Sequence, residues 1–196
     1  MASFLPRHAV SEDALLLLIN AERSLNLSLN HRLPTGRVGQ GRLSGSQQLE
    51  EQYGLFRLVS VTEAFLDAIS IEVVGREVDH SIKEQALIFG EWEISSTSSW
   101  AKREDAFESF LSFRLKSCGG YRQVKAAVHV RNAIAHGLGR ITARQRTTRT
   151  LASEVALIGV SVGGGQMLLG ANTFSITSAA CAELIRDVDV RVPLSV

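Results

Sequence analysis

The central stretch of the sequence is HVRNAIAHG, residues 129–137. At about 100° per residue, a helix over residues 124–135 gathers Val, Ala and Ile side chains on one apolar arc, and Arg131 falls inside that arc. A guanidinium among apolar side chains is costly unless a partner or a function compensates it. Asn132 and His136, four residues apart, project together from the flank of the arc.

Glycines close the predicted helix. Gly137 is a natural helix stop and Gly139 is a second breaker, so we expect His136 in the last turn, at the mouth of a cleft. His129 and Lys125 lie on the same flank about two and three turns before His136. An always charged, forked guanidinium beside an imidazole that exchanges protons near neutral pH is suited to phosphate chemistry.

The composition is that of an ordinary globular protein. The chain has 196 residues, of which 45% are hydrophobic and 21% charged, and this length fits a single domain over 1–196. Cys118 and Cys181 have no metal-ligand spacing, so we expect reduced thiols, no metal and no cofactor. The apolar run at 15–19 is too short to span a bilayer, which predicts a cytoplasmic protein without membrane contact.

Charge is unevenly distributed along the chain. Residues 109–153 contain nine Lys and Arg and no Asp or Glu, whereas the remainder carries 12 basic and 20 acidic residues. Clustered positive charge favours a polyanion such as RNA as the partner; a solvated basic face is the alternative. We expect an exposed basic arm at 137–153, with Arg140 and Arg144 joining Lys125 and His129 in RNA binding.

Hydrophobic periodicity predicts an all-α helical bundle with a short β-hairpin before the C-terminal helix. Trp92 and Trp100 are spaced like core residues and are interpreted as packing residues rather than as platforms on which nucleic-acid bases stack. Side-chain caps are expected at Ser11, at Ser98 or Ser99, and at Ser175 or Thr177. Helices are expected at about 11–29, 47–74, 76–92, 99–115, 121–136 and 178–189, the hairpin at 155–162 and 166–169, and a flexible basic loop at 31–46.

Glu63 is an acidic residue on the apolar side of the predicted helix at 47–74. It follows Val59 by four residues and precedes Leu66 by three. Because a buried carboxylate needs a partner, one hypothesis is that Glu63 approaches and orients Arg131. The alternative is a partly exposed glutamate at the edge of the core.

The motif RNAIAHG, residues 131–137, resembles the HEPN superfamily, whose ribonucleases carry Arg, a polar residue, a few further positions and then His near a helix end. Arg122 and His129 also satisfy the loose spacing. Asn132 directly after the arginine, a small residue before the histidine and the glycine that follows favour Arg131 and His136. Residues 58–66 resemble the packing helix of the family with its acidic position, and the likeness covers about residues 50–190.

The resemblance implies a HEPN-like bundle that pairs as a homodimer and cleaves RNA without a metal ion. Within the superfamily, the chain resembles small prokaryotic proteins of RNA-targeting and defence loci. This implies a toxin or defence effector, with an antitoxin or regulatory protein as a further partner. Arg131 would bind the phosphate, Asn132 would orient the histidine or the substrate, and His136 would act as general base or acid.

Two other readings stay open beside the endoribonuclease. One is a non-catalytic HEPN module that binds RNA, a nucleotide or a protein through the same basic cleft. The other is a structural helical dimer in which Arg131 and Glu63 form a buried ion pair. The intact motif favours the enzyme, because a binding module has no need of an imidazole at position 136.

Overall fold

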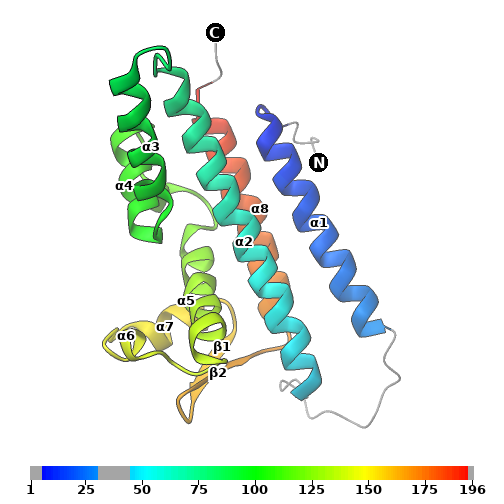
Figure 1. Ribbon diagram of the computed structural model, residues 1–196. Coiled ribbons are helices and arrows are strands. Elements are labelled where there is room, and N and C mark those ends of the chain that lie inside the picture. Colours follow the sequence, from blue (N-terminus) through cyan, green and yellow to red (C-terminus); the bar gives the residue numbers. More distant parts are fainter. Residues whose placement is uncertain (1–5, 31–44, 194–196) are drawn as a thin grey trace.

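The molecule is a helical bundle, as predicted from its sequence. The computed structural model describes residues 6–30 and 45–193. Within them the chain is predominantly α-helical, and its one two-stranded hairpin precedes the final helix, which confirms the predicted fold class. Three long helices run side by side (Figure 1), namely α1 (Ala9–Asn30), α2 (Gly45–Arg76) and α8 (Thr173–Arg191).

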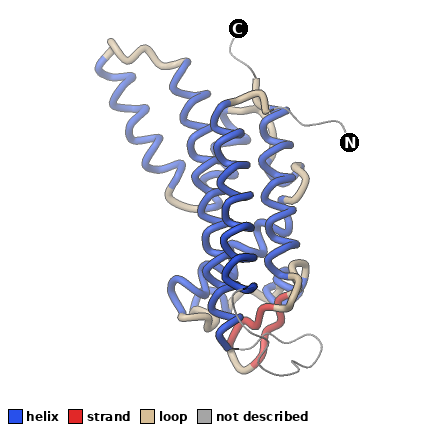
Figure 2. Tube along the Cα trace, turned by 90° about the vertical axis from the view of Figure 1, so that its right-hand side faces the viewer, coloured by secondary structure: helices blue, strands red, loops and turns tan. Residues whose placement is uncertain are grey.

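The shorter elements lie at the two ends of these long helices. At one end α3 (Lys83–Thr97) and α4 (Trp100–Phe110) form a helical hairpin beside α2. A 3₁₀ turn at Leu115–Ser117 then leads into α5 (Tyr121–Gly137), which packs on α2 and α8. Figure 2 shows the remaining elements gathered at the opposite end, namely α6 (Ala143–Arg146), α7 (Leu151–Ala156), β1 (Val160–Gly163) and β2 (Gln166–Leu169).

Two hydrophobic clusters hold the fold together, and α5 (Tyr121–Gly137) belongs to both. The first cluster joins α1, α2, α4 and α8 and includes fully buried Phe65, Phe107 and Leu184. The second joins α2, α5, α7 and the antiparallel hairpin and includes fully buried Val130 and Ile158. Each such side chain contributes about 1.5–3 kcal/mol to folding. Because residues of α5 pack in both clusters, the helix that carries the motif is held in place along its length.

The ends of the long helices differ from the prediction. The backbone N–H groups of Arg7 and His8 donate to the carboxylate of Asp189 on α8, at 2.8 and 3.0 Å, so α1 begins at Ala9. Ser11 therefore lies inside the first turn and does not cap it. At the start of α8, Asn172 precedes the helix and provides no side-chain cap, so the expected caps at 175 and 177 are wrong.

Smaller differences occur around α3 and α4. Helix α2 continues to Arg76. Helix α3 begins only at Lys83 and ends at Thr97, seven and five residues after the bounds that the sequence pattern predicted. Helix α4 ends at Phe110 instead of continuing to 115, because the chain turns at Ser112, whose φ is 60°. Ser99 caps α4 as predicted, accepting the Lys102 N–H at 3.3 Å.

The expected exposed arm at 137–153 is folded, so that part of the prediction is wrong. Thr142 and Gln145 form a reciprocal capping box that begins α6. Gln145 is buried, and so is Leu151 at the start of α7. The arginines of this segment do point to solvent. The expected loop at 31–46 lies outside the described residues, except for its last two, which begin α2.

No helix within 6–30 and 45–193 is both long enough and apolar enough to cross a membrane.

Glu51 is an unusual buried acid between α2 and the start of α8. Glu51 is only 5% exposed, and its Oε2 atom has no hydrogen-bond partner among the described residues. Burial raises the pKa of Glu51 to about 7, and the backbone N–H of Phe174 opposes this shift only in part. Ionised Glu51 therefore destabilises the fold.

We expect Glu51→Gln to change how stability depends on pH. The folded pKa lies above the unfolded one, so parent stability falls as pH rises from about 4.5 to 7 and stays lower above pH 7. The free energy of unfolding of the variant, relative to that of the parent, should increase by up to about 3 kcal/mol as the pH rises from 4.5 to 8. Urea unfolding measures this difference. Exposed Glu84→Gln is the control and should run parallel to the parent; parallel behaviour of the Glu51 variant would contradict the assignment.

Candidate functional site

Helix α5 is held at both ends by its backbone geometry. It starts after Gly120, whose φ is 71° and where a Cβ atom would lie 2.2 Å from the Ala180 carbonyl oxygen, so only glycine fits. It ends at Gly137, as predicted. The left-handed residue is the following Leu138, and the Gly139 N–H donates to the Ala133 carbonyl at 3.0 Å. The last turn of α5, with His136, is thereby fixed beside the loop that leads to α6.

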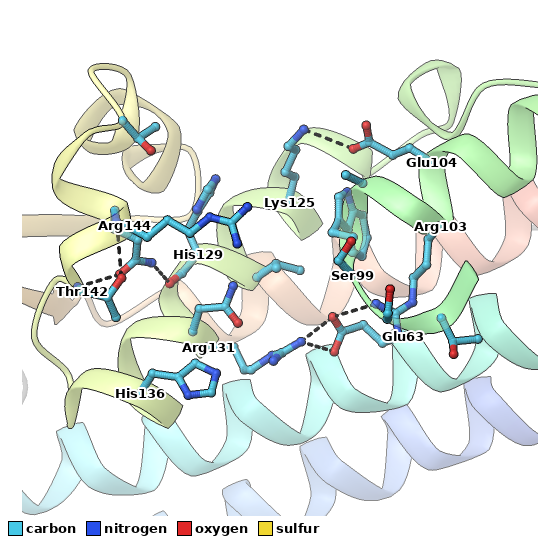
Figure 3. A pocket seen from close by; sticks show the side chains of 18 residues that line it. Glu63, Ser99, Arg103, Glu104, Lys125, His129, Arg131, His136, Thr142 and Arg144 are labelled. Atoms are coloured by element: carbon cyan, nitrogen blue, oxygen red, sulfur yellow. Dashed lines mark hydrogen bonds and ion pairs between the residues drawn. The ribbon is translucent and has the colours of Figure 1, made fainter. Parts of the chain in front are cut away.

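Arg131 meets Glu63, as the sequence hypothesis predicted. Nη2 of Arg131 donates to both carboxylate oxygens of Glu63 across the α2–α5 contact (Figure 3). The two side chains are 20% and 12% exposed, so the pair is largely shielded from water. This contact uses Nη2 alone, and the Nε of Arg131 is buried without a partner within the described residues. Nη1 makes no hydrogen bond to the described residues, so the guanidinium is oriented by Glu63 while Nη1 is left to donate to a ligand.

A second ion pair, which no sequence pattern indicated, extends this contact. Arg103 on α4 donates from Nε and Nη2 to the two carboxylate oxygens of Asp67, at 2.6 and 2.7 Å. Its Nη1 lies 3.5 Å from Glu63 Oε1. Burial disfavours the charged form of Arg103, but the hydrogen bonds to Asp67 outweigh it and raise its pKa. Arginines and acids therefore alternate in space, in the order Arg131, Glu63, Arg103 and Asp67. Glu63 lies between the two arginines, so Arg103 holds it from the other side.

A cavity of about 780 Å³ opens between α4, α5 and the α6 segment. This size is typical of ligand sites. Of the eight site residues predicted from the sequence, seven line it and Arg140 does not. The seven are Glu63, Lys125, His129, Arg131, Asn132, His136 and Arg144.

His136 and Asn132 are the polar side chains of the motif that remain without a protein partner. His136 is exposed, Asn132 is half-buried, and neither side chain makes a hydrogen bond to another residue within 6–30 and 45–193. Figure 3 shows His136 beside Arg131 at the same end of the cavity. An imidazole, an amide and an oriented guanidinium are therefore presented together to a ligand.

Lys125 and His129 have protein partners that were not predicted. Nζ of Lys125 donates to Glu104 Oε1 and to the Tyr121 hydroxyl, both at 3.1 Å. Burial disfavours the Lys125 charge, but these hydrogen bonds raise its pKa overall. Nε2 of His129 lies 3.1 Å from Glu154 Oε2, and burial lowers the pKa of His129 despite that carboxylate.

The α6 segment forms the remaining wall. Nε2 of Gln145 donates to the His129 carbonyl at 2.6 Å, which fastens α6 to α5. Arg144, the neighbour of Gln145, lines the cavity, whereas Arg140 is exposed outside it and pairs by its backbone with Gln166 of the hairpin. The predicted RNA-binding set is therefore divided, with Arg140 away from the cavity because its backbone joins the sheet.

The lining of the cavity favours an anion. It includes four permanently charged cations and two carboxylates, in addition to the two imidazoles. The cations are Arg103, Lys125, Arg131 and Arg144, and the carboxylates are Glu63 and Glu104. Among the described residues no three His, Cys, Asp or Glu side chains are grouped so that they could hold a metal ion. What the site offers is charge-assisted donors together with a free imidazole.

No protein-family model matches the chain, and no curated protein or solved structure matches it either.

Proposed function

We propose that the protein is a HEPN-type endoribonuclease that cleaves RNA without a metal ion, through attack by the ribose 2′-hydroxyl. The observation that carries the proposal is the arrangement at the end of α5, where Glu63 orients Arg131 beside the unpartnered His136 at the wall of an anion-favouring cavity. The resemblance of residues 131–137 to the HEPN motif supports the same reaction.

The three motif residues have separate roles in this reaction. Arg131 binds a non-bridging oxygen of the scissile phosphate through the donors that Glu63 does not use, and it stabilises the charge that develops there. His136 makes one of the two proton transfers as general base or acid. The Asn132 amide, which is free of protein partners among the described residues, orients His136 or the ribose by hydrogen bonding.

The bonds change as follows in the proposed reaction. The 2′-hydroxyl loses its proton to the base, and its oxygen forms a bond to the adjacent phosphorus. The bond between phosphorus and the 5′-oxygen of the next nucleotide breaks, and that oxygen takes up a proton. One strand then ends in a 2′,3′-cyclic phosphate, and the other begins with a 5′-hydroxyl. No water is consumed and no electron is transferred.

The charge of the surrounding surface supports RNA as the substrate. Residues 109–153 carry nine basic and no acidic side chains, and this stretch forms α5 and α6 and hence most of the cavity wall. Lys125 on α5 and Arg144 on α6 both line the cavity, where a phosphate backbone entering it can contact both. A homodimer and an antitoxin or regulatory partner belong to the proposal as well, on the resemblance alone.

The test is incubation of purified protein with a mixed-sequence single-stranded RNA in excess chelator. We expect cleavage that weakens steeply as salt increases, because phosphate contacts release counterions. Expression of the chain alone should reduce growth in the way a toxin does. Salt-dependent RNA binding without any cleavage would overturn the proposed enzymatic activity and favour a non-catalytic binding module.

A further inference from the structure

The cavity is larger than the proposed reaction at its Arg131 end requires. Along α5, Lys125 and His136 are separated by 11 residues, or about 16 Å of helix axis. Figure 3 shows Lys125, Glu104 and Ser99 at the end of the cavity remote from His136. A phosphate beside Arg131 leaves that end of the 780 Å³ cavity unfilled.

The remote end contains an aromatic wall. Trp100 lines the cavity and is only partly buried, although its side chain also packs against both hydrophobic clusters. Its ring centroid lies 6.2 Å from that of buried Tyr121, at an interplanar angle of 43°. The indole is thus fixed from behind while part of it faces the cavity. The predicted packing role of Trp100 is confirmed, and the residue lines the cavity as well.

Fixed polar groups surround this indole. Lys125 is held by Glu104 and Tyr121, and its ammonium lies 5.6 Å from the Tyr121 ring centroid. Ser99 accepts the Lys102 N–H and keeps its own hydroxyl hydrogen to donate. A rigid aromatic face with hydrogen-bond donors at its edge is the chemistry that binds a nucleobase, as in proteins that bind single strands by stacking.

We infer that the end of the cavity formed by Trp100, Ser99 and Lys125 is a nucleobase subsite, in which the base next to the scissile phosphate stacks on Trp100. The inference rests on the proposed function for the position of the phosphate. Stacking tolerates every base because each has a π face. The subsite therefore accepts all four bases, the larger purines more tightly, and it requires a nucleotide that is not paired in a duplex.

The test uses Trp92→Phe protein, in which Trp100 is the only tryptophan. Trp92 stacks on Phe89 with a centroid separation of 5.7 Å and does not line the cavity. Titration with adenosine 5′-monophosphate should quench the Trp100 fluorescence. Ribose 5-phosphate, which is the same sugar phosphate without the base, should bind about 5- to 150-fold more weakly by calorimetry and leave the fluorescence unchanged. Equal affinities of the two compounds would overturn the subsite.

Variants at position 100 then locate the effect. In otherwise unaltered protein, Trp100→Leu should lose the difference in affinity between the two compounds, and Trp100→Phe should retain part of it, with melting curves confirming that both fold. A full difference in folded Trp100→Leu would overturn the inference. Base-dependent binding without RNA cleavage would overturn the proposed endoribonuclease activity and support the nucleobase subsite. RNA cleavage without base-dependent binding would support the activity and overturn the subsite.

Discussion

His136→Ala should lower the rate of RNA cleavage by about 10²- to 10⁴-fold, the usual contribution of a positioned proton-transfer group. His136 is exposed at the last turn of α5 and makes no hydrogen bond to another described residue, so its removal should leave the folded structure intact. The measurement is single-turnover cleavage of a fluorescent RNA under excess enzyme. The RNA dissociation constant should change little, because the lysine and arginines of the cavity remain.

His80→Ala is the matched control for this substitution. His80 is also exposed, but it lies in the turn between α2 and α3, where it contacts Phe89 edge-on, and it is absent from the cavity. The control should cleave RNA at the parent rate. A His136→Ala protein as active as this control would contradict the role of His136 in proton transfer.

Arg131→Ala should lower cleavage by about 10²- to 10³-fold and also destabilise the fold. The rate falls because one preorganised donor to the developing oxyanion is lost. Stability falls because Glu63, 12% exposed, loses its main partner. Breaking a buried pair costs up to about 3–5 kcal/mol. Since Arg103 remains 3.5 Å from Glu63, we expect a smaller loss, about 1–3 kcal/mol by urea unfolding.

Arg131→Lys separates the two effects. The ammonium should restore most of the stability by keeping a charge near Glu63, yet recover little of the rate, because it lacks the fork that can bind Glu63 and phosphate together. Arg76→Ala is the control: Arg76 pairs with Glu72 on the surface of α2, and its loss should cost at most about 1 kcal/mol and leave cleavage unchanged. If Arg131→Ala lost stability but cleaved at the parent rate, the purely structural ion pair would be correct.

The Glu63–Arg131 contact could be predicted because both residues break an apolar pattern. Each is a charge on the buried side of a helix, and burial compels two such charges to find partners. The start and the end of α5 could be predicted for another local reason, because the glycines on either side of it favour the interruption of a helix. These features are encoded locally, and therefore the sequence reveals them.

Contacts between residues on different helices left no comparable signal. Neither Arg103 nor Asp67 carries a sequence feature that identifies its partner, and only the packing of α4 on α2 brings them together. The start of α1 is likewise set by Asp189, 181 residues from His8. Periodicity within one helix carries no information about such partners.

The prediction of an exposed arm after α5 is wrong for a related reason. Its composition is basic and weakly apolar, so it resembles an exposed arm. The capping box of Thr142 and the hydrogen bond from Gln145 to the His129 carbonyl nevertheless fold it against α5. Two polar side chains that satisfy backbone groups thus replace the hydrophobic burial that a periodicity search detects, and they carry Arg144 to the cavity.

The most direct measurement is the chemistry of the ends produced from a short RNA in excess chelator, with a single ribose replaced by 2′-deoxyribose. Mass spectrometry should find 2′,3′-cyclic phosphate and 5′-hydroxyl ends, and no cut on the 3′ side of the deoxy position. Both kinds of end should disappear with His136→Ala. Fragments with 5′-phosphate ends, or cleavage at the deoxy position, would contradict attack by the 2′-hydroxyl and with it the proposed reaction.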